Sequence, residues 1–189
     1  LLVLALAIAA LAVSGGCERL WTPQAPDGGV RLLHNSGPGK TVGLFTRDSC
    51  ELGILTIWND NGNVYVRFTS SPLSHCYLRR TRLAVGLALK NIPHDGQGRP
   101  VPGKFPFKAT HHPLRRVSSF TYSIPLTDWE PGTLVYVAGH AELCRGFGGC
   151  LCKTWAGCCQ FPCPDWACYT TFVIQQPPLQ VSGPPGGTD

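Results

Sequence analysis

The chain has 189 residues, enough for one ordinary domain with a hydrophobic core and short tails. Hydrophobic residues make up 43%, only 14% are charged, and glycine and proline number 22 and 17, which favours short strands joined by turns and excludes a mainly long-helical protein. The net charge of +5 suits an anionic partner.

The chain begins with the apolar segment "LLVLALAIAALAVSGG", residues 1–16. It is too short to cross a bilayer, since a spanning helix needs about 20 apolar residues. We expect a signal peptide, with Ala12-Val13-Ser14 as its small-x-small cleavage motif, and no stable membrane insertion. Two alternatives are a lipoprotein lipidated at Cys17, which would leave an odd number of cysteines, and a pilin-like packing helix, for which the segment is short.

Residues 17–45 are interrupted repeatedly by proline and glycine and predict an extended N-terminal arm. Only "VRLL" and "TVGLF" within it are expected to pair with other strands. At the other end of the chain, residues 176–189 form a second proline- and glycine-rich segment, which predicts an extended tail.

Between the arms, residues 46–175 predict a domain of about six short strands. "GILTIWNDNGNVYVRFTSS" is typical of a β-hairpin, because Val64, Val66 and Phe68 alternate with polar residues around an Asn/Gly turn. The later strands are expected in "RLAVGLAL", "SFTYSIPL", "TLVYVAGHAEL" and "YTTFVIQ". The prediction is an all-β fold, an antiparallel β-sandwich stapled by disulfides, with extended N- and C-terminal arms.

The hairpin turn also raises the alternative of a calcium loop. Asn59, Asp60, Asn61 and Asn63 supply oxygen atoms, but a single carboxylate carries little charge and the EF-hand spacing is absent. The turn is therefore interpreted as a structural hairpin turn.

Cysteine is the most informative residue type in this chain. Seven of the ten cysteines lie within residues 144–168 with the spacing C-x5-C-x-C-x5-C-C-x3-C-x4-C. An even number in an exported chain favours disulfides, while zinc coordination and a catalytic thiol remain the alternatives. The pairing cannot be read from the spacing. The expected disulfide cysteines are Cys17, Cys50, Cys76, Cys144, Cys150, Cys152, Cys158, Cys159, Cys163 and Cys168.

The order of motifs resembles a widespread extracellular β-rich domain of bacterial and algal secreted and surface proteins. The motifs are "GILTIWNDNGNVYVRFT", "TRLAVG", "GRPVPGKFPFK", "TYSIPL", "LVYVAGHAEL", "KTWAG" and "FPCPDWACYTTFVI", within residues 53–174. The resemblance implies a compact β-rich module beside other extracellular domains and implies no reaction. Cys158, Cys159 and Cys163 depart from that pattern, since the relatives have glycine or polar residues there, and Arg82 stands near the relatives' histidine.

The histidines are candidates for ligands or bases. His140 lies inside an expected strand, where a histidine is more often a core or rim residue. His111 and His112 are adjacent, so on a strand they would point to opposite faces and would not easily chelate one ion.

We expect no enzymatic activity, no cofactor and no metal. The sequence contains no nucleophile elbow, no H-E-x-x-H helix and no phosphate-binding glycine-rich loop. A secreted hydrolase remains an alternative only if distant carboxylates such as Asp60, Asp128 and Glu142 meet in the fold.

Two basic clusters favour an acidic polysaccharide over nucleic acid as the partner of an exported chain. The first cluster is Arg79, Arg80 and Arg82, and the second is Lys104, Lys108, Arg115 and Arg116. The alternative is that these cations are solvated residues protecting strand edges. Lys104 and Lys108 belong to the second cluster, and Trp155 and Trp166 are expected to be buried beside the disulfides. The candidate glycan or polyanion contacts are Trp58, Trp129, Arg79, Arg80, Arg82, Arg115 and Arg116.

These observations favour a non-enzymatic, secreted structural module, expected to be the subunit of a surface filament or matrix. Self-association into a homopolymer is expected through the terminal arms, since an extended segment such as "KTVGLF" can add a strand to a neighbour's sheet. A carbohydrate-binding or adhesion module is the alternative function.

Overall fold

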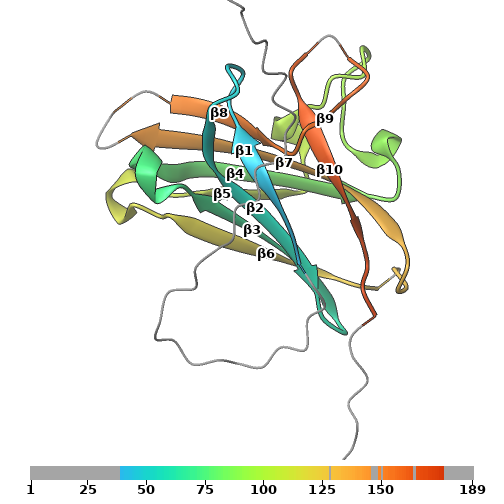
Figure 1. Ribbon diagram of the computed structural model, residues 1–189. Coiled ribbons are helices and arrows are strands. Elements are labelled where there is room, and N and C mark those ends of the chain that lie inside the picture. The colour runs from blue at the N-terminus through green and yellow to red at the C-terminus, as the bar shows by residue number, and fades with distance from the viewer. Residues whose placement is uncertain (1–38, 128, 146–148, 150, 164, 177–189) are drawn as a thin grey trace, which may run out of the picture. The chain divides into compact units, whose positions relative to one another are not determined.

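Figure 1 shows the computed structural model, which describes residues 39–127, 129–145, 149, 151–163 and 165–176. These residues belong to the second of the two compact units of the chain, His34–Asp189. The strands are β1 Lys40–Phe45, β2 Glu51–Asn59, β3 Asn63–Ser70, β4 Cys76–Gly86, β5 Phe107–Thr110, β6 Ser119–Pro125, β7 Leu134–Arg145, β8 Leu151–Ala156, β9 Cys159–Gln160 and β10 Cys168–Val173. Short 3-10 helices are η1 Pro72–Ser74, η2 Leu89–Asn91, η3 Pro102–Lys104 and η4 Pro113–Arg115.

The described strands form one antiparallel sheet in the order β5-β4-β7-β8-β1-β2-β3-β6. β7 is the longest strand and has neighbours on both sides: β4 along one edge, and β8 and β10 sharing the other. The sheet bends until its two end strands approach each other. At this point Tyr122 of β6 donates a hydrogen bond from its hydroxyl to the carbonyl oxygen of Thr81 in β4, at 3.0 Å.

The all-β, antiparallel class expected from the sequence is confirmed. The strands join one nearly closed sheet, however, and not the two separate layers expected for a sandwich. The physical reason is β1, whose residues pair with β2 along its length and with β8 at Leu44 and Phe45, so that it connects the two halves of the sheet.

β1 lies at the end of the expected arm. Its segment "TVGLF" was expected to pair with other strands, and residues 40–45 pair with β2 and β8 of this chain, where Leu44 is fully buried. Residues 1–38 and 177–189, which carry the apolar segment and most of both arms, lie outside the described residues. Within the described ranges, no helix has the length and apolar character needed to cross a membrane.

Most of the expected strands are found, including the hairpin of β2 and β3. The Oδ1 atom of Asp60 accepts hydrogen bonds from the backbone N–H groups of Gly62 and Asn63, both at 2.8 Å, and its Oδ2 accepts from the Tyr65 hydroxyl. These bonds account for the polar turn as a hairpin turn. β5, β8 and β9 were not expected, because they lie in a proline-rich loop and in the cysteine-rich segment.

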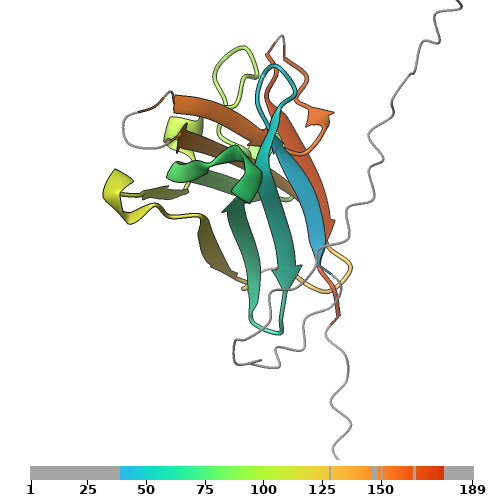
Figure 2. The same ribbon diagram turned by 60° about the vertical axis from the view of Figure 1, so that its left-hand side comes forward.

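Two hydrophobic clusters lie on opposite faces of the sheet. The larger one fills the concave interior and includes Leu55, Phe68 and Leu143. The smaller one includes Ile92, Phe105, Trp155 and Phe161, from β8 and from the loops that follow β4 and β9. Figure 2 shows these loops projecting at one end of the sheet. Loop side chains therefore cover part of the outer surface of β4, β7 and β8, and the rest of that surface faces solvent.

Candidate functional site

The outer face of β5, β4, β7 and β8 gathers most of the chemistry-bearing side chains. Alternate residues of a strand point to opposite faces, and the inward residues Thr81, Leu83, Ala141 and Leu143 are fully buried. The intervening residues face outward in two cross-strand rows, which the pairing register defines. The rows are Lys108, Arg82, His140 and Trp155, and Thr110, Arg80, Glu142 and Lys153.

Glu142 lies at the centre of this face and is only 5% exposed. Its Oε1 accepts a hydrogen bond from Nη1 of Arg82 at 2.7 Å, and its Oε2 accepts one from Nη1 of Arg80 at 3.0 Å. Burial by itself would raise the pKa of Glu142, but the hydrogen bonds and charges of Arg82 and Arg80 hold it below its ordinary value. The carboxylate thus stays ionised and orients two guanidinium groups.

His140 packs against this ion pair network. Its ring is buried, makes an edge-on contact with Trp155 at 5.0 Å between ring centroids, and lies 3.5 Å from Nη1 of Arg82 through Nδ1. Burial, assisted by the charge of Arg82, lowers the pKa of His140 to about 4. The imidazole is therefore neutral at pH 7, and its contacts are those of a packed residue at the rim of the smaller hydrophobic cluster.

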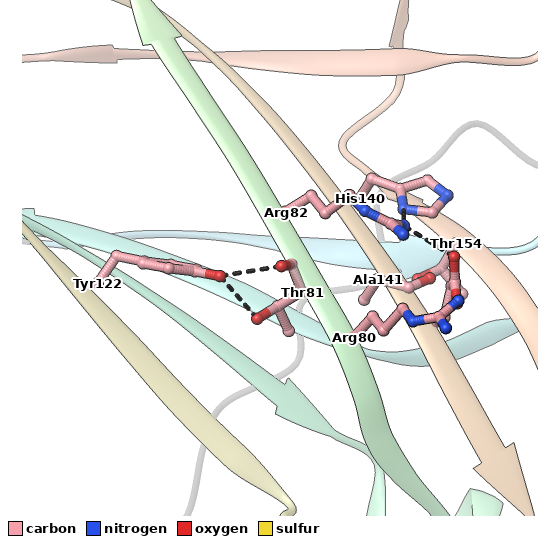
Figure 3. A network of polar contacts seen from close by, with 8 residues as sticks. Arg80, Thr81, Arg82, Tyr122, His140, Ala141 and Thr154 are labelled. Atoms are coloured by element: carbon pink, nitrogen blue, oxygen red, sulfur yellow. Dashed lines mark hydrogen bonds and ion pairs between the residues drawn. The ribbon is translucent and has the colours of Figure 1, made fainter. Parts of the chain in front are cut away.

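Figure 3 shows Arg80, Arg82 and His140 on neighbouring strands, while Tyr122 reaches Thr81 from elsewhere in the sheet. Four cations, Arg80, Arg82, Lys108 and Lys153, thus share the outer face with one buried carboxylate. Arg80, Lys108 and Lys153 are exposed, and the side chain of Arg82 is 19% exposed. This face carries a net positive charge at pH 7.

The second basic cluster adjoins the first through a bulge in β4 and through η4. The register of β4 against β7 shifts between Leu78 and Arg80, and the intervening Arg79 donates from Nη1 to the carbonyl oxygen of His111 at 2.8 Å. Arg116, which directly follows η4, places its guanidinium 5.7 Å from the ring centroid of Tyr77. A shallow depression lies here, lined by Tyr77, Leu78, Arg79, Pro113, Arg116 and Cys144.

Sequence reasoning identified the arginines but not Lys153 or the role of Glu142. Lys153 is isolated in the sequence between cysteines, and only the register of β8 against β7 places it opposite Glu142. Strand alternation in "HAEL" places His140 and Glu142 on one face, and in "RRTR" it places Arg80 and Arg82 on one face. It does not predict that β4 and β7 are neighbours. Arg115 is exposed on η4 at the edge of this region.

The candidate tryptophans do not form one platform. Trp58 lies on β2, stacked on Tyr65 at 5.3 Å, with the guanidinium of Arg67 4.9 Å from its centroid. Trp129 instead packs, partly buried, against the larger hydrophobic cluster. Trp155 is buried as expected, and Trp166 packs against the same smaller cluster.

The remaining candidate groups are apart. His111 is buried against Phe120, and His112 is exposed and accepts a hydrogen bond from the N–H of Leu114. Asp60 belongs to the hairpin turn, far along the sheet order from Glu142, and Asp128 lies outside the described residues. The described carboxylates named for a hydrolase thus have separate structural partners.

Six of the described cysteines are free thiols, namely Cys50, Cys76, Cys158, Cys159, Cys163 and Cys168. Cys144 and Cys152 lie on β7 and β8, while Cys17 and Cys150 fall outside the described residues. Burial, with the nearby Cys158 and Cys159 thiols, raises the pKa of Cys168. No group of three or more histidine, cysteine or acidic side chains within the described ranges is arranged to hold a metal ion. Disulfide formation stays a prediction.

The fold and this face define an all-β protein with one bent antiparallel sheet and a cationic outer surface. Comparison with known proteins finds no matching family model, no matching curated protein and no matching solved structure.

Proposed function

We propose that this protein is a non-enzymatic extracellular module that binds an acidic polysaccharide through the cationic face of β5, β4, β7 and β8. The observation that supports the proposal is that Arg80 and Arg82 of the first cluster, Lys108 of the second cluster and Lys153 share one face around Glu142, although they are separated in the sequence. A solvated strand edge accounts for isolated cations, but it does not account for cations of three strands gathered on one face around a single buried carboxylate.

The geometry suits a linear polyanion. The four cations lie on three strands, β5, β4 and β8, and β7 between β4 and β8 contributes His140 and Glu142. Because neighbouring strands are about 4.8 Å apart, the cations span roughly 15 Å across the sheet. Exposed charges of one sign attract an oppositely charged polymer over about one Debye length, roughly 8 Å at physiological ionic strength. Binding by this face should therefore weaken as salt concentration rises.

The test removes Lys108 and Lys153 and leaves the ion pairs of Arg80 and Arg82 with Glu142 in place. The Lys108→Ser/Lys153→Ser variant should bind a sulfated polysaccharide such as heparin roughly three- to tenfold more weakly at low salt, taking about 0.5 kcal/mol for each exposed contact. The matched control, Lys40→Ser/Lys90→Ser, removes the same charge from outside this face and should change the dissociation constant little. Equal weakening by both variants would show attraction to net charge alone, and the proposal would fail.

The structural role belongs to the same proposal. A secreted module that binds an acidic polysaccharide suits a surface or matrix, and the disulfides and the remaining arm residues are its predicted means of stabilisation and self-association. Since residues 40–45 lie within this chain's own sheet, the arm available for polymerisation shortens to residues 17–39. Negative-stain microscopy of the secreted protein tests filament formation, and isolated particles would remove the filament from the proposal.

The disulfides carry their own prediction. Each bridge should stabilise the fold by about 2–4 kcal/mol, because it restricts the unfolded chain. We expect reductant to lower the midpoint of denaturant unfolding of the secreted protein, and the β9–β10 end to gain hydrogen exchange before the β2–β3 hairpin. A thiol count of ten in the secreted, unfolded protein would rule out the disulfides.

A further inference from the structure

One edge of the sheet is unprotected. β6 is the last strand in the sheet order, and among the described strands it pairs with β3 alone, in continuous register from Ser119 to Pro125. The carbonyl oxygen of Ser118 accepts from the N–H of Ser70, and the N–H of Leu126 donates to Gly62. The even-numbered residues thus direct their backbone groups toward β3. Those of Thr121 and Ser123 point to the open side.

The two end strands of the sheet differ in how their edges are protected. β5 has only four residues and carries the charge of Lys108. β6 has seven residues, "SFTYSIP", without a charged side chain. Natural sheets usually blunt such an edge with charge, a bulge or proline. The only such device in β6 is Pro125 at its very end.

β5 does not satisfy the open groups of β6. The space between the two strands is bridged by side chains, since the ring of Tyr122 packs on Phe107 and its hydroxyl contacts Thr81. β5 itself pairs only with β4 in the described part of the chain. The peptide groups of Thr121 and Ser123 therefore point to the side of β6 away from β3, where no described strand pairs with them, and both residues are exposed.

We propose that β6 pairs with β6 of a second copy of this chain, antiparallel and about a twofold axis at Tyr122. This register places Thr121 of each copy opposite Ser123 of the other, so that about four reciprocal backbone hydrogen bonds form. Ser119 then lies opposite Pro125 of the other copy. Proline has no N–H to donate, but the carbonyl oxygen of Pro125 can accept a hydrogen bond from the N–H of Ser119. Because β6 has no charged side chain, this pairing brings no like charges together. Ser119, Thr121 and Ser123 are exposed and carry hydroxyl groups, and threonine also favours strand structure.

A dimer would carry two cationic faces. The cationic face lies on β5, β4, β7 and β8, and neither the proposed axis nor β6 covers it. Two copies thus present two such faces on one particle. A dimer would bind a long polyanion with higher avidity than a monomer and could join two polymer chains.

The test uses the full secreted chain in sedimentation equilibrium. We expect a dimer in the unaltered protein and a monomer in Ser123→Pro, because proline removes an outward N–H without breaking a bond to β3. Ser123→Ala keeps that N–H and should remain dimeric. If Ser123→Pro does not fold, as judged by circular dichroism, Thr121→Lys/Ser123→Lys supplies the same test by charge repulsion with an intact backbone.

Two results would overturn the proposal. One is an unaltered protein that stays monomeric at concentrations of about 100 μM, since μM dissociation constants would already give dimers there. The other is an assembly that persists in the β6 variants but is lost on deletion of residues 17–39, which would assign association to the arm. Heparin binding by the monomeric variant distinguishes failure of the dimer from failure of the polysaccharide site.

Discussion

The Glu142→Gln variant is expected to lose about 2–3 kcal/mol of unfolding free energy. The substitution keeps the shape of the side chain but leaves Arg80 and Arg82 beside each other without a counter-charge. Removing one partner of a fully buried pair costs roughly 3–5 kcal/mol. The smaller figure follows because the side chain of Arg80 is 46% exposed and water screens its charge.

Equilibrium unfolding in urea measures this loss. Glu130→Gln is the matched control, since Glu130 is exposed and the same change there should stay within about 0.5 kcal/mol. If the two variants were equally stable, the ion pair network would contribute nothing to folding, and its role in holding the arginines would be unsupported.

The same Glu142→Gln variant should bind heparin more tightly than the unaltered protein, although it is less stable. The change removes the one carboxylate of the cationic face and leaves its four cations in place. Affinity is measured at 10 °C, where the less stable variant is still folded, so that the lost stability does not reduce the folded fraction. Weaker binding would mean that Glu142 is needed to position the arginines for the ligand.

Acidification from pH 7.5 to pH 5 is expected to cost the protein about 2 kcal/mol through His140. The pKa of this buried imidazole is about 4 in the folded protein against 6.5 for an ordinary histidine. Below pH 6.5 the unfolded chain binds a proton that the folded protein does not, so stability falls as pH decreases from 6.5 toward 4. Above pH 6.5 both states hold neutral histidine and this dependence vanishes.

The check compares urea unfolding of the unaltered protein and His140→Gln between pH 7.5 and 5. Glutamine does not titrate, so the variant should show a clearly smaller decline with falling pH. His111 should cause part of the remaining loss of stability at low pH, because burial also lowers its pKa. The His111→Gln variant measures that part. Glu142 adds its own loss only below about pH 4.5, outside the measured range. Parallel pH profiles for His140→Gln and the unaltered protein would contradict the assignment.

Local patterns predicted much of this fold because they depend on neighbours in the chain. The alternation of Val64, Val66 and Phe68 identified β3 and its buried face, and the Asn/Gly turn identified its partner β2. Tertiary pairing overrode local sequence elsewhere. β5 forms in a proline-rich loop because β4 offers it an edge, and β8 forms among cysteines because it lies between β7 and β1.

The candidate site was predictable only in part. Arg80 and Arg82 stand two residues apart, so a strand places both on one face, and the sequence shows this directly. Their carboxylate partner is 60 residues or more away in the chain, and Lys153 reaches the same face from a third strand. Those neighbours follow from the order of strands in the sheet, which no periodicity encodes.

By itself, the sequence determined the all-β class, the hairpin and the two separate basic clusters, because composition, turns and alternation are local properties. Only the tertiary structure decided which strands β1 pairs with, since its position between β2 and β8 exists only once both halves of the sheet are folded. It also decided that Arg80, Arg82, Lys108 and Lys153 share one face with Glu142, and that β6 pairs with β3 alone among the described strands. Both depend on strand order, which is settled by which buried faces pack together across long separations in the chain.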